Sequence, residues 1–139
     1  MKNFKHYILA GILLATTFQI TAQGYKLPAY EKFKLPNGLV IYLMEQHEVP
    51  LISVSAIFPA GAIYDGEQSG LASLTAAGLK HGTQSMTKAQ LDEELDFLGA
   101  SVNTFASKES SGLSAKFSAK DKDKILSLIK EILLNPVFD

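Results

Sequence analysis

The sequence predicts an α+β domain with an antiparallel-rich sheet and helices on one of its faces. Three observations lead to this prediction. Turn signals join neighbouring strand-like segments into hairpins, apolar residues recur at helical spacing in later segments, and the segments follow the order ββ–β–α–α–ββ–α. Short turns join antiparallel neighbours, so the hairpins imply antiparallel pairing.

The first part of the chain carries three strand-like segments. Residues 31–35 alternate polar and apolar side chains, Pro36-Asn37-Gly38 is a turn signal, and residues 39–44 are apolar and strand-like. These features predict a hairpin. Residues 51–58, Leu-Ile-Ser-Val-Ser-Ala-Ile-Phe, are a second apolar run rich in β-branched residues and predict a third strand.

Two helices are expected next. From Gly70 to Lys80, Leu71, Leu74 and the small pair Ala77-Gly78 predict a helix that packs closely against a sheet. Residues 87–90, Thr-Lys-Ala-Gln, have the capping-box pattern that starts a helix. Leucines 91, 95 and 98 share one face of that second helix, and Gly99 is its stop signal. Its acidic run Asp92-Glu93-Glu94 is interpreted as a solvated face and not as a metal cluster.

The last part of the sequence predicts a second hairpin and a final helix. Residues 100–107 and 112–118 are the strands, joined by Lys-Glu-Ser-Ser at residues 108–111. A helix begins between Ser118 and Asp121 and ends before Pro136. Its apolar residues recur at i, i+3, i+4, i+7 and i+8: Ile125, Leu128, Ile129, Ile132 and Leu133.

The N-terminus has the pattern of a secretory signal peptide. Lys2 and Lys5 precede an apolar run within residues 7–18, and Thr-Ala-Gln follows at residues 21–23. Residues 1–23 are therefore predicted to be a signal peptide, which places the mature chain in a bacterial periplasm. The alternative is a retained membrane anchor, although no stop-transfer pattern follows.

Composition narrows the choice of partners. The chain has thirteen lysines and arginines together and fourteen acidic residues. Removal of residues 1–23 takes away two of the lysines, so the formal charge becomes −3. Without a basic block, nucleic acid is not an expected partner. The chain has no cysteine, so it carries no disulfide signature of an oxidising compartment.

Residues 70–83 read Gly-Leu-Ala-Ser-Leu-Thr-Ala-Ala-Gly-Leu-Lys-His-Gly-Thr. This stretch resembles the zinc-site helix of the insulinase/pitrilysin-like (M16) metallopeptidases, whose pattern is G-L-A-H-F-L-E-H-M-L-F-K-G-T. Lys-Leu-Pro-Asn-Gly-Leu-Val-Ile at residues 34–41 and Pro-Ala-Gly-Ala at residues 59–62 also resemble the family. The resemblance covers about residues 30–139 and implies an M16 metallopeptidase-like α+β domain. Relatives are several hundred residues long, so residues 24–139 are expected to be the incomplete, N-terminal portion of one domain.

The two zinc-binding histidines and the catalytic glutamate of the family motif are missing from this sequence. Ser73 and Ala77 stand where the ligand histidines belong, and Ala76 stands where the glutamate belongs. In H-x-x-E-H, histidines at i and i+4 bind one zinc ion, and the glutamate activates a zinc-bound water as general base. A serine hydroxyl is a poor zinc ligand and alanine is none. The resemblance therefore implies no metal site and no catalytic residue in this segment.

The nearest histidine, His81, is not expected to replace the missing zinc ligands. His81 occupies the lysine position of the family pattern, and it is interpreted as a surface histidine at a helix end. The alternative, a relocated metal ligand, would need partners that this stretch does not offer. His47 follows a predicted strand and is interpreted as a solvated loop residue.

A second segment resembles the substrate cleft of the family. In relatives, the small residues of G-A-x-x-N-A-x-T line the cleft beside the zinc. Residues 99–105 keep the glycine, the alanine and Asn103, but Phe105 replaces a smaller or tyrosine side chain. Asn103 and Phe105 are therefore the candidate cleft residues. Phe105 either fills space left by the missing metal or is an ordinary strand residue that faces the core, and the second interpretation is preferred.

The resemblance implies a non-catalytic M16 homologue, a peptide-binding or structural partner of a zinc-bearing M16 subunit. Zinc is then expected only in that partner or in a downstream domain. The alternative is the inactive first domain of a longer zinc metallopeptidase whose active site lies beyond Asp139. A scaffold role, as in the core subunits of a respiratory complex, and a truncated gene product are further hypotheses.

Overall fold

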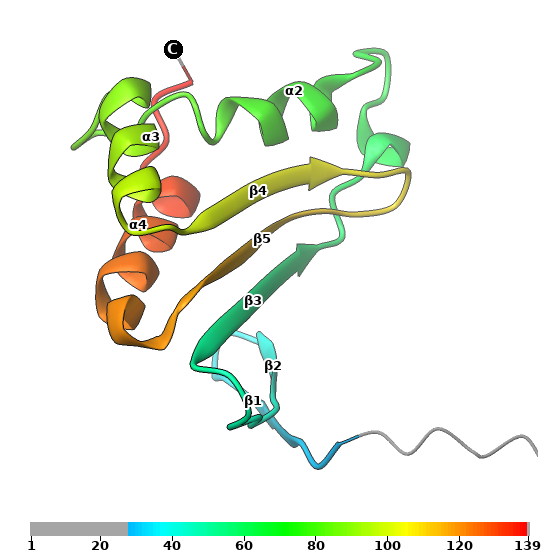
Figure 1. The fold of residues 1–139 in the computed structure, drawn as a ribbon. Coiled ribbons are helices and arrows are strands. Elements are labelled where there is room, and N and C mark those ends of the chain that lie inside the picture. Colours follow the sequence, from blue (N-terminus) through cyan, green and yellow to red (C-terminus); the bar gives the residue numbers. More distant parts are fainter. Residues whose placement is uncertain (1–27, 139) are drawn as a thin grey trace, which may run out of the picture. The chain divides into compact units, whose positions relative to one another are not determined.

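The computed structural model describes residues 28–138 (Figure 1). The predicted signal peptide, residues 1–23, lies outside the described residues, so export stays a prediction. The described residues divide into two compact units, residues 28–45 and 46–138. Within residues 28–138, no helix combines the length and the apolar character that a bilayer-spanning segment needs.

The first unit contains the predicted hairpin. Strands β1 (Glu31–Lys34) and β2 (Val40–Leu43) pair antiparallel, with Glu31 opposite Leu43. Gly38 has a φ of 91°, a left-handed conformation that glycine adopts without strain, and it turns the chain. Across the hairpin, a hydrogen bond with the Tyr42 side chain raises the pKa of Lys32 above its usual value.

The second unit is built on a three-stranded antiparallel sheet. Its strands are β3 (Leu51–Phe58), β4 (Ser101–Ala106) and β5 (Ser111–Ser118), in the order β3-β5-β4. Ala115 of β5 lies opposite Val54 on one side and Val102 on the other. The predicted strands and their order along the chain are confirmed, and β3 has the predicted bounds.

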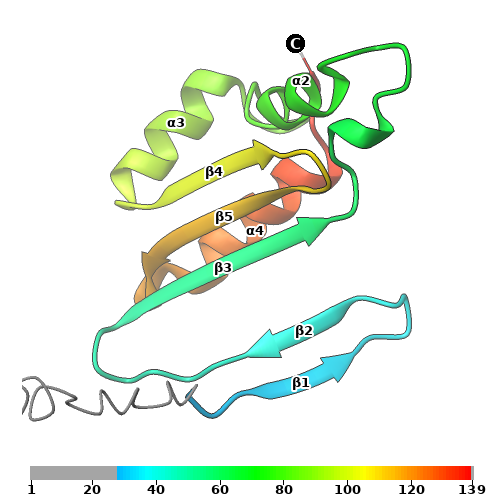
Figure 2. The ribbon, with the colours of Figure 1, turned by 90° about the vertical axis from the view of Figure 1, so that its right-hand side faces the viewer.

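Alternation along β5 separates a buried face of the sheet from an open one. Leu113, Ala115 and Phe117 are buried, whereas Lys116 between them is exposed. Helix α4 (Lys122–Leu134) follows a 3₁₀ turn, η2 (Ala119–Asp121), and packs its apolar stripe on the buried face. In Figure 2 α4 lies behind the strands, and none of the described helices lies in front of them. The core residues from the helices are Leu91, Leu95, Ile125, Leu128, Ile129 and Ile132.

Helix α3 (Lys88–Phe97) begins at the predicted capping box. The Thr87 hydroxyl accepts a hydrogen bond from the Gln90 N–H at 3.3 Å, and the Gln90 side-chain oxygen accepts one from the Thr87 N–H at 2.9 Å. Its acidic run is only partly the solvated face that the sequence predicts. Glu94 is partly buried and pairs with Lys124 of α4, because α4 packs beside this side of the helix.

Helix α2 (Leu71–Gly78) lies against β4 but presents a different face than expected. Ala76 is buried at 4% exposure, and Leu79, just after the helix, packs on the core. Leu74 is 73% exposed, and Leu71 is exposed as well. The expectation that these leucines pack against the sheet is therefore wrong, because the small side chains make the close contact.

The N-terminus of α2 is held by a residue from the preceding loop. This loop follows the 3₁₀ turn η1 (Ala62–Tyr64). Gly70 at the N-cap has no side chain to cap the helix, and the Asp65 carboxylate takes this role. It accepts hydrogen bonds from the Gly70 N–H at 2.8 Å and the Ala72 N–H at 2.9 Å.

We expect Asp65→Ala to lower the free energy of unfolding by about 1 kcal/mol, because two N–H groups at the start of α2 lose their acceptor. Urea unfolding followed by circular dichroism measures this change. The control is Glu67→Ala, an exposed acidic residue of the same loop, which we expect to change stability little. Equal effects of the two substitutions would contradict the capping role of Asp65.

Candidate functional site

The degenerate motif lies on α2, and its three positions differ in burial. Ser73 and Ala77, four residues apart on one helix face, are both exposed. Ala76 is buried. The helix has therefore kept a position beside β4, while the residues at its two ligand positions are open to solvent.

The donor set on α2 does not fit zinc. Tetrahedral zinc sites in proteins use thiolate, imidazole or carboxylate ligands, and Ser73, Ala76 and Ala77 supply none of these. Within residues 28–138, no group of three or more histidine, aspartate or glutamate side chains gathers as a metal site would require.

The two histidines of this part of the chain lie at the surface. His81 follows α2 in a turn, where its N–H donates to the Gly78 carbonyl at 2.9 Å, and its side chain is exposed. This agrees with its interpretation as a surface residue at a helix end. His47 is exposed in the loop between β2 and β3, as the sequence also predicts.

Asn103 and Phe105 both lie on the open face of the sheet. Their neighbour Val102 is buried on the helix side, so alternation along β4 directs them to the opposite face. Asn103 donates a hydrogen bond to the Ser101 hydroxyl at 3.0 Å and lines a shallow cavity of about 330 Å³. The other side chains there are mostly small and polar: Ser53, Ser55, Ser101, Ser114 and Lys116.

The preferred interpretation of Phe105 as a core residue is wrong. Its ring lies over Gly112 of β5, where an added Cβ would come within 2.8 Å of the ring. Phe105 therefore needs a glycine opposite it in register, and Gly112 supplies that space. The ring covers a neighbouring strand on the open face, and the core is on the other face.

The chain near residue 138 contacts the end of α2, which sequence reasoning missed. An isolated bridge joins Thr83 to Pro136, and the Val137 N–H donates to the Gly82 carbonyl at 3.3 Å. The Phe138 ring then lies against Gly78, where a Cβ would come within 2.7 Å of it. Gly78 replaces the methionine of the family pattern, and this replacement was the only sequence signal for the contact.

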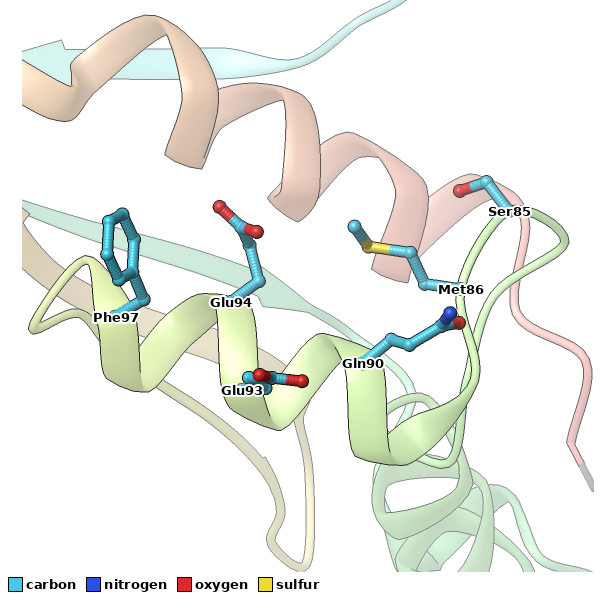
Figure 3. Close-up of a pocket in the computed structure, with 6 residues that line it drawn as sticks. All are labelled: Ser85, Met86, Gln90, Glu93, Glu94 and Phe97. Carbon is cyan, nitrogen blue, oxygen red and sulfur yellow. The ribbon is translucent and has the colours of Figure 1, made fainter.

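A cavity of the described residues lies along α3 and away from the motif helix (Figure 3). Its volume is about 530 Å³. Figure 3 shows Phe97, Glu94 and Met86 on the side of α3 that faces the orange-red helix α4. The remaining residues that line it are Ser85, Gln90 and Glu93. No sequence signal indicated this groove.

Comparison with known proteins supports both the observed fold and the resemblance to M16 peptidases. The family described as insulinase (peptidase family M16) matches residues 40–139. The non-peptidase homolog YmxG of Helicobacter pylori is 27% identical over 139 residues, which cover 99% of this chain and 30% of that protein. The mitochondrial-processing peptidase subunit beta of Caenorhabditis elegans is 30% identical over 105 residues, covering 73% of this chain and 22% of that protein.

A solved structure shows the same fold. The crystal structure of a peptidase M16 inactive domain from Pseudomonas fluorescens superposes with a TM-score of 0.77 at 25% identity. The match covers 80% of this chain and 27% of that one. The chain therefore spans less than a third of the length of these similar proteins. Because the family match extends over most of the sequence, the chain belongs to the insulinase family of peptidases, family M16.

Proposed function

We propose that this chain is a non-catalytic M16 homologue that acts as a peptide-binding or structural partner of a zinc-bearing M16 subunit. The observation that carries the proposal is which residues occupy the zinc-ligand and base positions of α2. The helix packs beside β4, yet its exposed ligand positions hold Ser73 and Ala77 and its base position holds a buried alanine. An M16 fold without the zinc ligands and the glutamate base fits a role in binding or assembly.

The similar proteins support this reading. One carries the name non-peptidase homolog, and another is described as an inactive M16 domain. A third is named as the beta subunit of a processing peptidase. Transferred to this chain, these names favour a metal-free member that works beside other chains.

The exposed face of α2 suits contact with a partner. Leu71 and Leu74 are large apolar side chains that lie in the open beside the ligand positions. Exposed apolar residues that gather on one helix often mark an interaction surface. In this proposal, the open face of the sheet, with Asn103 and Phe105, supplies one wall of a peptide-binding cleft.

A second candidate is the inactive first domain of a longer zinc metallopeptidase whose H-x-x-E-H lies beyond Asp139. It is favoured by the greater length of the similar proteins. In both candidates zinc belongs to another subunit or another domain. Both also include secretion to the periplasm after removal of residues 1–23, with no nucleic acid as partner and no lasting membrane insertion.

We expect the endogenous protein, purified by affinity from the periplasmic fraction, to bring with it an M16 chain that carries H-x-x-E-H. Intact-mass analysis and peptide sequencing identify both chains. We expect Leu74→Ser to weaken this recovery, because it removes an exposed apolar contact on α2. The control is Val49→Ser, an exposed apolar residue outside α2.

The same purification separates the candidates. A much longer polypeptide that includes this sequence would favour the inactive first domain. Recovery of this chain alone, at its own mass, would contradict both candidates and would favour a truncated gene product.

We expect the triple variant Ser73→His, Ala76→Glu, Ala77→His to show little or no peptidase activity. A glutamate at the buried position 76 must lose its hydration. A zinc site also needs a third ligand and outer-shell partners, which these three substitutions do not add. The matched control is the double variant Ser73→His, Ala77→His, whose changes are exposed and leave the core intact.

The two variants give distinct readouts. We expect the triple variant to be less stable than the double variant by roughly 1–3 kcal/mol in urea unfolding. Hydrolysis of a fluorogenic peptide at rates typical of M16 enzymes would show that the rest of the site is intact and would contradict this expectation.

A further inference from the structure

The open face of the three-stranded sheet carries two polar rows that run across the strands. Lys116 of β5 lies opposite Ser53 of β3 and Ser101 of β4, so these three side chains form one row. The next row on the same face has small polar side chains: Ser55, Ser114 and Asn103. Both rows line the shallow cavity of about 330 Å³, on the side of the sheet that no described helix covers (Figure 2).

Lys116 is the only charged side chain on the three strands of this sheet. It is exposed, and it makes no ion pair with any residue between 28 and 138. None of the three strands contains an aspartate or a glutamate. A lysine that lies among hydroxyl groups, with no carboxylate on the same strands, suits an anionic group from a ligand.

The hydroxyl next to Lys116 has a proton available for that ligand. The Asn103 side-chain amide donates a hydrogen bond to the Ser101 oxygen at 3.0 Å. Because the Ser101 oxygen accepts this bond, its own proton is left to donate to another acceptor. Ser101 and Lys116 are directly opposite in register, and residues so placed have Cβ atoms about 5 Å apart. The two side chains are therefore close enough to donate to the two oxygens of one carboxylate.

A third row on the open face is apolar. Gly112 lies opposite Ile57 on one side and Phe105 on the other, and the Phe105 ring covers it. Ile57 is 64% exposed. Gly112 is four residues from Lys116 along β5, which is about 13 Å in a strand. Residues i and i+4 of an extended peptide are the same distance apart and point to the same side.

We propose that the open face binds an extended, acidic peptide segment. Its carboxylate pairs with Lys116, and an apolar side chain four residues away packs on Ile57 and Phe105. A small or polar side chain midway between them lies over the second polar row. Charge complementarity selects the acidic peptide, because a basic side chain would meet Lys116 and find no carboxylate on these strands. This peptide class rests on the proposed function, in which the open face supplies one wall of the cleft, and makes that function more specific.

The test is the binding of a fluorescent, end-blocked peptide, Ala-Glu-Ala-Ser-Ala-Leu-Ala, to the purified protein, followed by fluorescence anisotropy. We expect the same peptide with glutamine in place of glutamate to bind roughly tenfold more weakly, because a charged hydrogen bond is lost. We expect Lys116→Gln to weaken binding of the glutamate peptide by a similar factor and to leave the glutamine peptide unaffected. Ile57→Ser is expected to weaken binding of both peptides, since both carry the leucine.

The matched control is Lys108→Gln, which removes an exposed lysine in the turn between β4 and β5. We expect it to leave the affinity for the glutamate peptide unchanged. An equal loss of affinity in Lys108→Gln and Lys116→Gln would overturn the proposal, because general charge attraction would then account for the binding.

Three other results would also overturn it. They are no binding of either peptide, equal binding of the glutamate and glutamine peptides, and a dimer of the protein alone that Lys116→Gln dissociates in sedimentation velocity. The last result would assign the open face to a second copy of the chain. The proposed function is tested separately, by recovery of an M16 chain in the affinity purification, so its failure is distinguishable from failure of the acidic-peptide proposal.

Discussion

Strand β5 is the constraint on which the second unit depends. It pairs along its whole length with β3, and its first six residues pair with β4, so both outer strands take their register from it. On one face it contributes Leu113, Ala115 and Phe117 to the core, and α4 covers that face. Each of these side chains points into the core only in this register, because a shift of one residue would move all three to the open face.

The contacts that hold α2 in place lie outside the two positions that bind zinc in the family motif. Helix α2 is held by the Asp65 cap at its start, by the buried Ala76 beside β4, and by Phe138 against Gly78 near its end. None of these contacts involves the ligand positions. The support of the helix therefore does not depend on the side chains at residues 73 and 77.

Much of the fold could be predicted because its signals are local. The capping box at Thr87, the turn at Gly38 and the apolar periodicity of α4 each depend on residues that are close in sequence. The lost motif is also local, since it is read from residues 73–77 alone. These features correspond to the elements whose bounds the structure reproduces within a few residues.

The failed predictions concern which side of an element meets its neighbours. Leu74 looked like a packing residue but is exposed, and Phe105 looked like a core residue but lies on the open face. Glu94 looked solvated but pairs with Lys124, thirty residues further along. Sequence spacing defines faces of a helix or strand but does not say which face another element will cover. The Asp65 cap was missed for a similar reason. Asp65 lies five residues before the N-cap residue Gly70, and no capping pattern in the sequence has this spacing.

We propose that this part of the chain, which has the M16 fold, carries no catalytic zinc site. Metal analysis of the purified mature chain at neutral pH tests it most directly, beside an M16 protein with an intact H-x-x-E-H taken through the same steps. The account predicts stoichiometric zinc in the intact protein and only trace zinc in this chain. One zinc ion per chain, retained through gel filtration, would contradict it.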